Sequence, residues 1–477
     1  MRVYSKESKR LKQAQSFLSR HFPDYGVNKK QEITRLLYEI SKRENILPSK
    51  IIEHQYSPGY DTLKKELLER RYPLSYSSCQ SLKPHLPKIE LNPHQAAVLK
   101  KRRFYPKDIF IEEKASQSAL ASRLKEFFPK ANFKVIGSLK EYMITSAACA
   151  RADYNKRRER LFIVNEKYDF FKPCPCTASA LNCGYHIFNL GFGCIFECNY
   201  CFLQDYTNVP GIILTANIEK FFDEFSRYKR NGMRLGTGEF SDSLALDDIT
   251  GYAMPLVEFF KGHKEVIFEF KTKSIQVKNL LKLKPAGNIV VSWSINPQQI
   301  IEENEFLTPS LSERLAAARA CAQAGYRIGF HFDPILYYDG WEGAYAQVVE
   351  TIFEAIHPKD IAWISLGTFR FSRGLRQVIE RRFPQNTILN EELLLGYDHK
   401  LRYPYRIRYV LYKKMLELLS EHLPKFNIYL CMEEALMWKE LKLDASGYLH
   451  KCLTRLVLVL LLYLTNDATI SAHNIGC

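Results

Sequence analysis

The feature that most constrains the fold is an alternation of strand-like and helix-like segments after Pro173. Short apolar or alternating runs, typical of strands, lie at residues 185–190, 234–235, 266–270, 289–294, 327–332 and 361–366. Helix-like segments between them include residues 218–230, 312–324 and 344–355. Because such alternation favours a parallel sheet, we predict a partial (β/α)6 barrel, with its chemistry at the carboxyl ends of the strands.

Three cysteines follow the first predicted strand in the order CxxxCxxC, as Cys194, Cys198 and Cys201. A [4Fe–4S] cluster takes four cysteine thiolates, and structural zinc also takes four ligands. Three thiols therefore predict a [4Fe–4S] cluster with one iron left open to a group that is not protein. The alternative is three buried free thiols, since unpaired cysteine is among the most buried residue types.

The spacing, the preceding strand and the aromatic Phe202 resemble the cluster loop of the radical S-adenosylmethionine (SAM) enzymes. This resemblance implies that the amino acid end of SAM chelates the open iron. After the second strand, Gly236, Gly238 and Glu239 form a GxGE segment whose glycines allow a ligand to approach the backbone. By the same resemblance, Glu239 binds the cofactor's ammonium group. Otherwise the segment is a turn.

Composition favours a polyanionic partner in the cytoplasm. The 477 residues carry a formal net charge of +16, which favours nucleic acid over a merely basic surface. The 12 cysteines occur without an apolar signal segment at the N-terminus, so we expect reduced or metal-bound thiols in the cytoplasm. The apolar run at residues 456–464 is too short to span a bilayer, and we expect no membrane association.

The chain divides into four predicted parts. Residues 1–99 form a basic, mainly helical extension, and residues 100–172 a small α/β domain with basic runs at 100–103 and 156–160. Residues 173–443 form the barrel, and residues 444–477 a C-terminal tail. The basic runs are either solvated faces or contacts to phosphates.

Further segments resemble spore photoproduct lyases, in their order along the chain. They are Phe104-Tyr105-Pro106 with Ile111-Glu112, Cys194 to Gln204, Ser294-Ile295-Asn296, Pro334-Ile335, Gly340-Trp341 and Arg402-Tyr403. The resemblance covers about residues 103–430 and implies the radical SAM partial barrel. It also implies an enzyme that generates a 5′-deoxyadenosyl radical to repair thymine photolesions in DNA, a carbon–carbon lyase reaction.

The same resemblance implies roles for individual residues. Lys273 and Ser294 contact the cofactor, while Arg402 and Tyr403 hold the damaged base. Tyr200 belongs to a relay beside the cluster. An external one-electron reductant is implied as a partner.

Two departures from the family pattern leave the substrate open. Glu239 stands where these lyases carry a hydrogen-donating cysteine, and Phe202 replaces a second relay tyrosine. A lyase-like enzyme acting on RNA or protein is therefore an alternative. A non-catalytic iron–sulfur protein that binds nucleic acid is another.

A second group of thiols, Cys174, Cys176 and Cys183, precedes the first strand. With a fourth ligand such as Cys149 they would form an auxiliary cluster, and otherwise they are structural thiols. Cys321 lies in a predicted helix outside the barrel and is not expected to reach the substrate.

Overall fold

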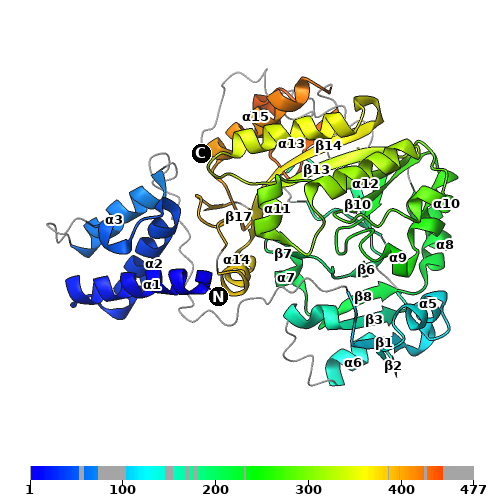
Figure 1. The fold of residues 1–477 in the computed structure, drawn as a ribbon, viewed down its shortest axis with the longest axis horizontal. Coiled ribbons are helices and arrows are strands. Elements are labelled where there is room, and N and C mark those ends of the chain that lie inside the picture. The colour runs from blue at the N-terminus through cyan, green and yellow to red at the C-terminus, as the bar shows by residue number, and fades with distance from the viewer. Residues whose placement is uncertain are drawn as a thin grey trace, which may run out of the picture.

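The computed structural model describes residues 2–52, 59–73, 104–145, 154–166, 171–176, 180–229, 232–384, 386–396, 398–423 and 427–443. Figure 1 shows three parts: a helical unit at the N-terminal end, a smaller sheet and a larger sheet covered by helices. Cys149 and the predicted tail at 444–477 lie outside the described residues. No helix in the described ranges combines the length and apolarity that a membrane crossing requires.

The larger sheet is the predicted barrel. Its eight strands have the order β18-β14-β13-β11-β10-β9-β5-β4. The six predicted strands are β5 (Tyr185–Phe188), β9 (Met233–Thr237), β10 (Val266–Thr272), β11 (Ile289–Ser294), β13 (Arg327–Ile335) and β14 (Ile361–Thr368). Each of these six strands pairs in parallel with the next one along the sheet, which confirms the partial barrel.

Two strands at the sheet edges were not predicted. β18 (Ile428–Leu430) pairs in parallel with β14, and β4 (Phe171–Pro173) pairs antiparallel with β5. Segments of three residues show no period, so the sequence pattern gave no signal for them.

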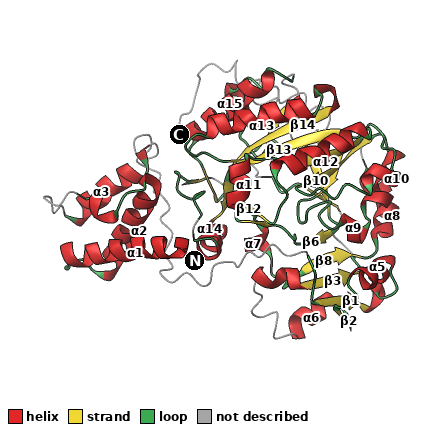
Figure 2. Cartoon of the chain, viewed as in Figure 1, coloured by secondary structure: helices red, strands yellow, loops and turns green. Residues whose placement is uncertain are grey.

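Helices cover the outer face of this sheet (Figure 2). They include α8 (Ile218–Tyr228), α10 (Ala253–Lys261), α12 (Leu311–Gln323), α13 (Trp341–Ala355) and α15 (Tyr405–Ser420). All six residues of β11 are buried, as expected for a strand with neighbours on both sides and packed faces. Helix α12 begins with a capping box, in which Ser310 and Glu313 satisfy each other's backbone N–H groups. Cys321 is buried within α12, outside the barrel mouth as predicted.

The smaller sheet has the order β2-β1-β3-β8-β6. Its strands are β2 (Asn132–Ile136), β1 (Asp108–Glu112), β3 (Arg160–Val164), β8 (Ile212–Thr215) and β6 (Gly191–Phe192). β6 precedes the CxxxCxxC segment and β8 follows it, so the chain enters the segment from this sheet and later returns to it. A Cβ at Gly191 would lie 2.3 Å from the Ile213 carbonyl oxygen, so only glycine permits the β6–β8 pairing at this point.

The N-terminal unit contains α1 (Arg2–His21), α2 (Val27–Glu44) and α3 (Tyr60–Arg71), with an apolar core of its own. A buried ion-pair network joins it to α14 (Arg373–Arg382) of the barrel part. Glu39 lies 2.6 Å from Arg376 Nη2 and 3.0 Å from Arg71 Nε. Burial alone would raise the pKa of Glu39, but the guanidinium groups around it outweigh burial and lower that pKa. The helical extension is therefore docked on the barrel through paired buried charges.

Candidate active site at the mouth of the barrel

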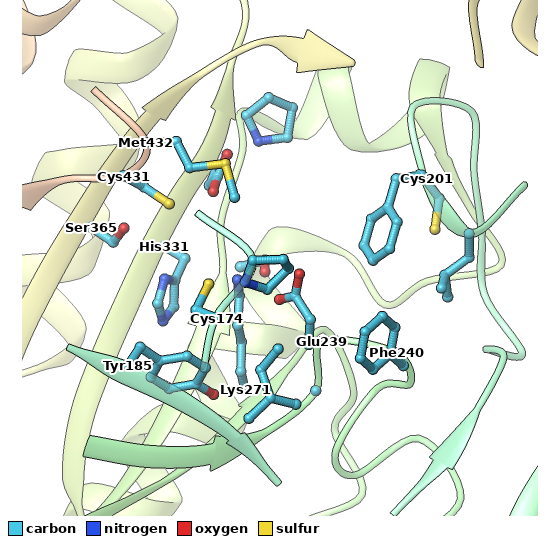
Figure 3. A pocket seen from close by; sticks show the side chains of 18 of the residues that line it. Cys174, Tyr185, Cys201, Glu239, Phe240, Lys271, His331, Ser365, Cys431 and Met432 are labelled. Atoms are coloured by element: carbon cyan, nitrogen blue, oxygen red, sulfur yellow. The ribbon is translucent and has the colours of Figure 1, made fainter. Parts of the chain in front are cut away.

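A cavity of about 620 Å³ opens at the carboxyl ends of the barrel strands. Its walls come from the cluster loop, from the ends of β9, β10, β11, β13 and β14, and from the segment after β18. In Figure 3, Cys201 lies at one side, Glu239 and Cys174 near the centre, and Cys431 with Met432 at the other side. The location agrees with the predicted placement of chemistry in a β/α barrel.

The three predicted cluster ligands, Cys194, Cys198 and Cys201, all line this cavity as free thiols. Burial raises the pKa of Cys194 to about 12 and also raises the pKa values of Cys198 and Cys201. Among the described residues, no three cysteine, histidine or acidic side chains converge on a single-ion site. Each thiolate of a [4Fe–4S] cluster binds its own iron, so its sulfurs need not converge on one point. Three cavity-facing thiols without disulfides therefore fit a cluster with one open iron.

Buried polar contacts fix the backbone of the cluster loop. β7 (Glu197–Cys198) pairs antiparallel with β12 (Glu305–Phe306). The Gln204 amide donates to the carbonyl oxygens of Cys198 and Asn199, at 2.9 Å each. The loop is thus held from both sides before any metal binds.

Glu197, inside the cluster loop, is held by two arginines. Arg157 Nη1 donates to its carboxylate at 2.9 Å, and Arg382 Nη2 donates to it at 3.0 Å. Arg157 Nε also donates to the Cys194 carbonyl oxygen at 3.1 Å. One buried carboxylate thereby ties the cluster loop to both the smaller sheet and α14.

The predicted GxGE segment ends β9 at the cavity edge. A Cβ at Gly236 would lie 2.3 Å from the Tyr185 hydroxyl oxygen. Gly238 has φ of +102°, and a Cβ there would lie 2.4 Å from the Lys271 carbonyl oxygen. Both positions require glycine for close packing, and Gly238 also for its backbone conformation. Their direct contact with a cofactor remains a prediction.

Glu239 projects into the cavity close to Lys271 (Figure 3). Burial raises the pKa of Glu239, and the nearby Lys271 ammonium opposes that rise. Asp242, three residues later, accepts from Thr272 Oγ1 at 2.5 Å and from the Lys273 backbone N–H at 2.7 Å. This carboxylate fastens the loop after β9 to the end of β10, and the motif analysis did not single it out.

Glu305 connects three of the predicted site positions. It lies 3.9 Å from Lys273 Nζ, accepts a hydrogen bond from the Tyr200 hydroxyl, and forms an ion pair with Arg314 at 2.6 Å. Arg314 in turn donates to the Ser294 carbonyl oxygen at 2.9 Å. Tyr200, Lys273 and Ser294 all line the cavity, so the structure brings these residues together around one buried carboxylate.

Glu305 is expected to make the fold sensitive to acid. Burial alone would raise its pKa, but Arg314, Lys273 and its hydrogen bonds lower that pKa to about 2. The stabilisation is therefore present above about pH 4.5 and is lost as the pH falls towards 2. Glu305→Gln should lower the urea midpoint of the metal-free chain near neutral pH. On acidification to about pH 3 the urea midpoint of this variant should fall less than that of the wild type. Equal acid-induced losses in variant and wild type would contradict this role.

Arg402 and Tyr403 do not line the cavity themselves, although they neighbour Arg370 and Phe369, which do. Arg402 forms an ion pair with Asp398, and Tyr403 is 1% exposed. The Tyr403 hydroxyl accepts from the Tyr337 backbone N–H at 3.1 Å. In this structure both residues stabilise the chain next to the cavity through these internal contacts. Their contact with a damaged base stays a prediction.

The far wall of the cavity contains groups that sequence patterns did not reveal. Arg370 Nη1 donates to Asp333 Oδ1 at 3.0 Å, and Arg370 Nη2 donates to the Cys431 sulfur at 3.4 Å. Arg370 follows β14 and Cys431 follows the short strand β18. Neither Arg370 nor Cys431 stands in a motif or a periodic run of the sequence.

The second thiol group also lines the cavity, with Cys174, Cys176 and Cys183 all present in its wall. The sulfur atoms of Cys174 and Cys176 are 3.6 Å apart. The auxiliary cluster stays a prediction, because its suggested fourth ligand, Cys149, lies outside the described residues.

Comparison with known proteins identifies the family. The family model described as spore photoproduct lyase matches residues 104–434. The chain belongs to the spore photoproduct lyase family. Among curated relatives, the spore photoproduct lyase of Geobacillus sp. (strain Y412MC61) is 26% identical over 295 residues, 60% of this chain and 84% of the relative. The enzyme of Bacillus subtilis (strain 168) is 26% identical over 301 residues, 61% of this chain and 86% of the relative.

Solved structures of spore photoproduct lyases share the fold. One, complexed with dinucleoside spore photoproduct, has a TM-score of 0.60 and 24% identity, and covers 70% of this chain and 100% of that chain. A double variant with bound AdoMet and dinucleoside spore photoproduct has a TM-score of 0.59 with the same identity and coverage. The family match confirms the predicted resemblance and leaves the helical extension outside the matched range.

Proposed function

We propose that this chain is a radical SAM lyase that repairs a thymine photolesion in DNA. The observation that supports the proposal most directly is the cavity at the barrel mouth, where three free thiols face the GxGE loop in a member of the spore photoproduct lyase family. When bound, the cluster and SAM supply a 5′-deoxyadenosyl radical, and an external one-electron donor supplies the electron. The protein supplies binding, orientation and exclusion of water.

The cavity's own residues suit these tasks. Cys194, Cys198 and Cys201 would hold the cluster. Lys273 and Glu239 present a cation and a carboxyl group suited to the carboxylate and ammonium ends of an amino acid. Gly238 lines the cavity and would let that ligand approach the backbone, and Ser294 would provide a hydroxyl group. Gly236, two residues earlier, packs against Tyr185 and would support this segment from behind.

A DNA partner is supported by charge and by the relatives. The chain carries a formal net charge of +16, and one related lyase structure contains dinucleoside spore photoproduct. We assign Arg402 and Tyr403 to the segment that borders the bound lesion, and Tyr200 to hydrogen or electron transfer beside the cluster. The free cysteines among the described residues suit the reducing cytoplasm.

The function is tested by anaerobic reconstitution with iron and sulfide, followed by reduction with SAM and a DNA oligonucleotide carrying the thymine–thymine spore photoproduct. We expect 5′-deoxyadenosine to form and the lesion to be converted back to two unlinked thymines. Cofactor cleavage without any thymine recovery would contradict the lyase assignment. The same oligonucleotide should bind less tightly as salt rises, because phosphate contacts release counterions.

One observation keeps a second substrate class in view. The residues from Gly238 to Ser243, in the loop after β9, include no cysteine to donate hydrogen to a product radical. If the substrate is RNA or protein, its hydrogen should appear in the 5′-deoxyadenosine formed from deuterium-labelled SAM, whereas incubation with photolesion DNA should transfer none. The family match favours the DNA lesion over this alternative and over a binding protein without turnover.

A further inference from the structure

The cavity contains thiols besides the three assigned to the cluster. Cys174, Cys176, Cys183 and Cys431 line it, although the loop after β9 has no cysteine. A reaction that leaves a carbon radical on its substrate needs a weak X–H bond nearby, and a thiol supplies one. The question is which of these sulfurs is placed to do so.

Backbone pairing at the sheet edge positions Cys174. It follows β4 directly, and its backbone N–H donates to the Tyr185 carbonyl oxygen at 2.9 Å, which continues the β4–β5 ladder. The neighbouring Cys176 N–H donates back to the Cys174 carbonyl oxygen at 2.7 Å. This tight turn fixes both cysteines at the cavity wall instead of leaving them on a free loop.

Cys174 lies beside the loop that lacks a thiol. Figure 3 shows its side chain near the middle of the cavity, next to Lys271 and Glu239. The hydrogen bond with Cys176, burial and the Glu239 carboxylate all raise the pKa of Cys174, so the group is a thiol and not a thiolate. The 3.6 Å contact between the two sulfurs uses one thiol hydrogen and leaves the other available.

Cys431 is less suited to the same task. Its sulfur accepts from the Arg370 guanidinium at 3.4 Å, at the side of the cavity occupied by Met432 and Ser365 (Figure 3). Arg370 is itself paired with Asp333. Both sulfurs accept a hydrogen bond and keep their own S–H, but the partner of Cys431 is a guanidinium in an ion pair, which cannot pass on a hydrogen atom, whereas the partner of Cys174 is a second thiol.

We propose that Cys174 returns a hydrogen atom to the substrate radical, with Cys176 as its partner thiol. The proposal rests on the proposed lyase function. In this step the Cys174 S–H bond breaks and a C–H bond forms on the thymine product, which leaves a thiyl radical on Cys174. Exchange with Cys176 breaks its S–H bond, restores the Cys174 thiol and moves the radical two residues along the chain. The hydrogen taken from the substrate would be carried as a C–H bond of 5′-deoxyadenosine. Its transfer to the Cys176 sulfur would restore that thiol and return the radical to the cofactor, so the cycle consumes no net reductant.

The test compares wild type, Cys174→Ala, Cys174→Ser and Cys321→Ala as reconstituted enzymes acting on the photolesion oligonucleotide in D2O. Thiol hydrogens exchange with solvent, so wild type should place deuterium in the first thymine product. Both Cys174 variants should still cleave the cofactor and consume the lesion. Their thymine yield should be at least about tenfold lower, and the thymine should contain no deuterium from solvent. Cys321→Ala removes a buried thiol outside the cavity and should match wild type.

A second readout does not depend on turnover. Phenylarsine oxide binds adjacent dithiols, so the reconstituted wild type should take up one equivalent more than Cys174→Ala or Cys176→Ala, measured by intact mass. Unchanged thymine yield and deuterium content in Cys174→Ala would overturn the proposal. Loss of thymine recovery in Cys431→Ala instead of Cys174→Ala would also overturn it. Loss of half of the bound iron in Cys174→Ala would overturn it too, because that result would indicate an auxiliary cluster. Absence of thymine from wild type itself would instead refute the proposed function.

Discussion

Replacing Cys194, Cys198 and Cys201 together with alanine is expected to remove the iron–sulfur absorption and abolish cofactor cleavage. All three thiols line the same cavity, and burial holds them protonated until a metal displaces their protons. Residues that act as one unit lose function together, so the rate of 5′-deoxyadenosine formation should fall by at least about 1000-fold. The measurements are iron content, visible absorption and chromatography of the reduced reaction with SAM.

Cys321→Ala is the matched control for the triple variant, because it removes a thiol that is 0% exposed and lies in α12. It should keep its iron and its cofactor cleavage. A triple variant that makes as much 5′-deoxyadenosine as wild type would refute the cluster assignment. Urea unfolding of the metal-free chains should separate a local loss of ligands from a general loss of fold.

The sequence specified most of the barrel because its strands are long, buried and separated by periodic helices. The fully buried β11, which is mostly apolar, and the amphipathic helix α8 are examples in which one sequence pattern predicts both the element and its burial. The short edge strands β4 and β18 escaped notice, since three residues reveal no period. Yet these two strands carry Cys174 and Cys431 to the cavity.

The candidate site was predictable where local spacing determines it and unpredictable where tertiary pairing does. The CxxxCxxC and GxGE segments lie at the barrel mouth, as their positions after strands β5 and β9 indicated. Glu305 and Arg370 gave no signal, because each acquires its role from partners distant in sequence. Glu305 reaches Tyr200 across 105 positions of the chain. No periodicity or motif encodes such a contact.

Replacing Glu197 with alanine is expected to be the most damaging single change outside the cysteines. Its carboxylate is the shared partner of Arg157 and Arg382, whose side chains are 1% and 5% exposed. Removing one member of a buried ion pair leaves uncompensated charge and costs about 3–5 kcal/mol. We therefore expect urea unfolding to report that loss in the metal-free chain.

The same change should weaken the cluster site, because Arg157 also donates to the Cys194 carbonyl oxygen at 3.1 Å. Without Glu197 the Arg157 guanidinium loses its ion pair and keeps only carbonyl hydrogen bonds to the loop, at Cys194 and Phe196. We therefore expect reconstituted iron to be lost faster to a chelator. Glu159→Ala is the matched control, since Glu159 pairs with Lys107 through side chains that are 43% and 68% exposed. An exposed pair contributes at most about 1 kcal/mol, so this variant should unfold and retain iron like wild type. Equal stability and equal iron retention in the two variants would show that Glu197 does not hold the cluster loop.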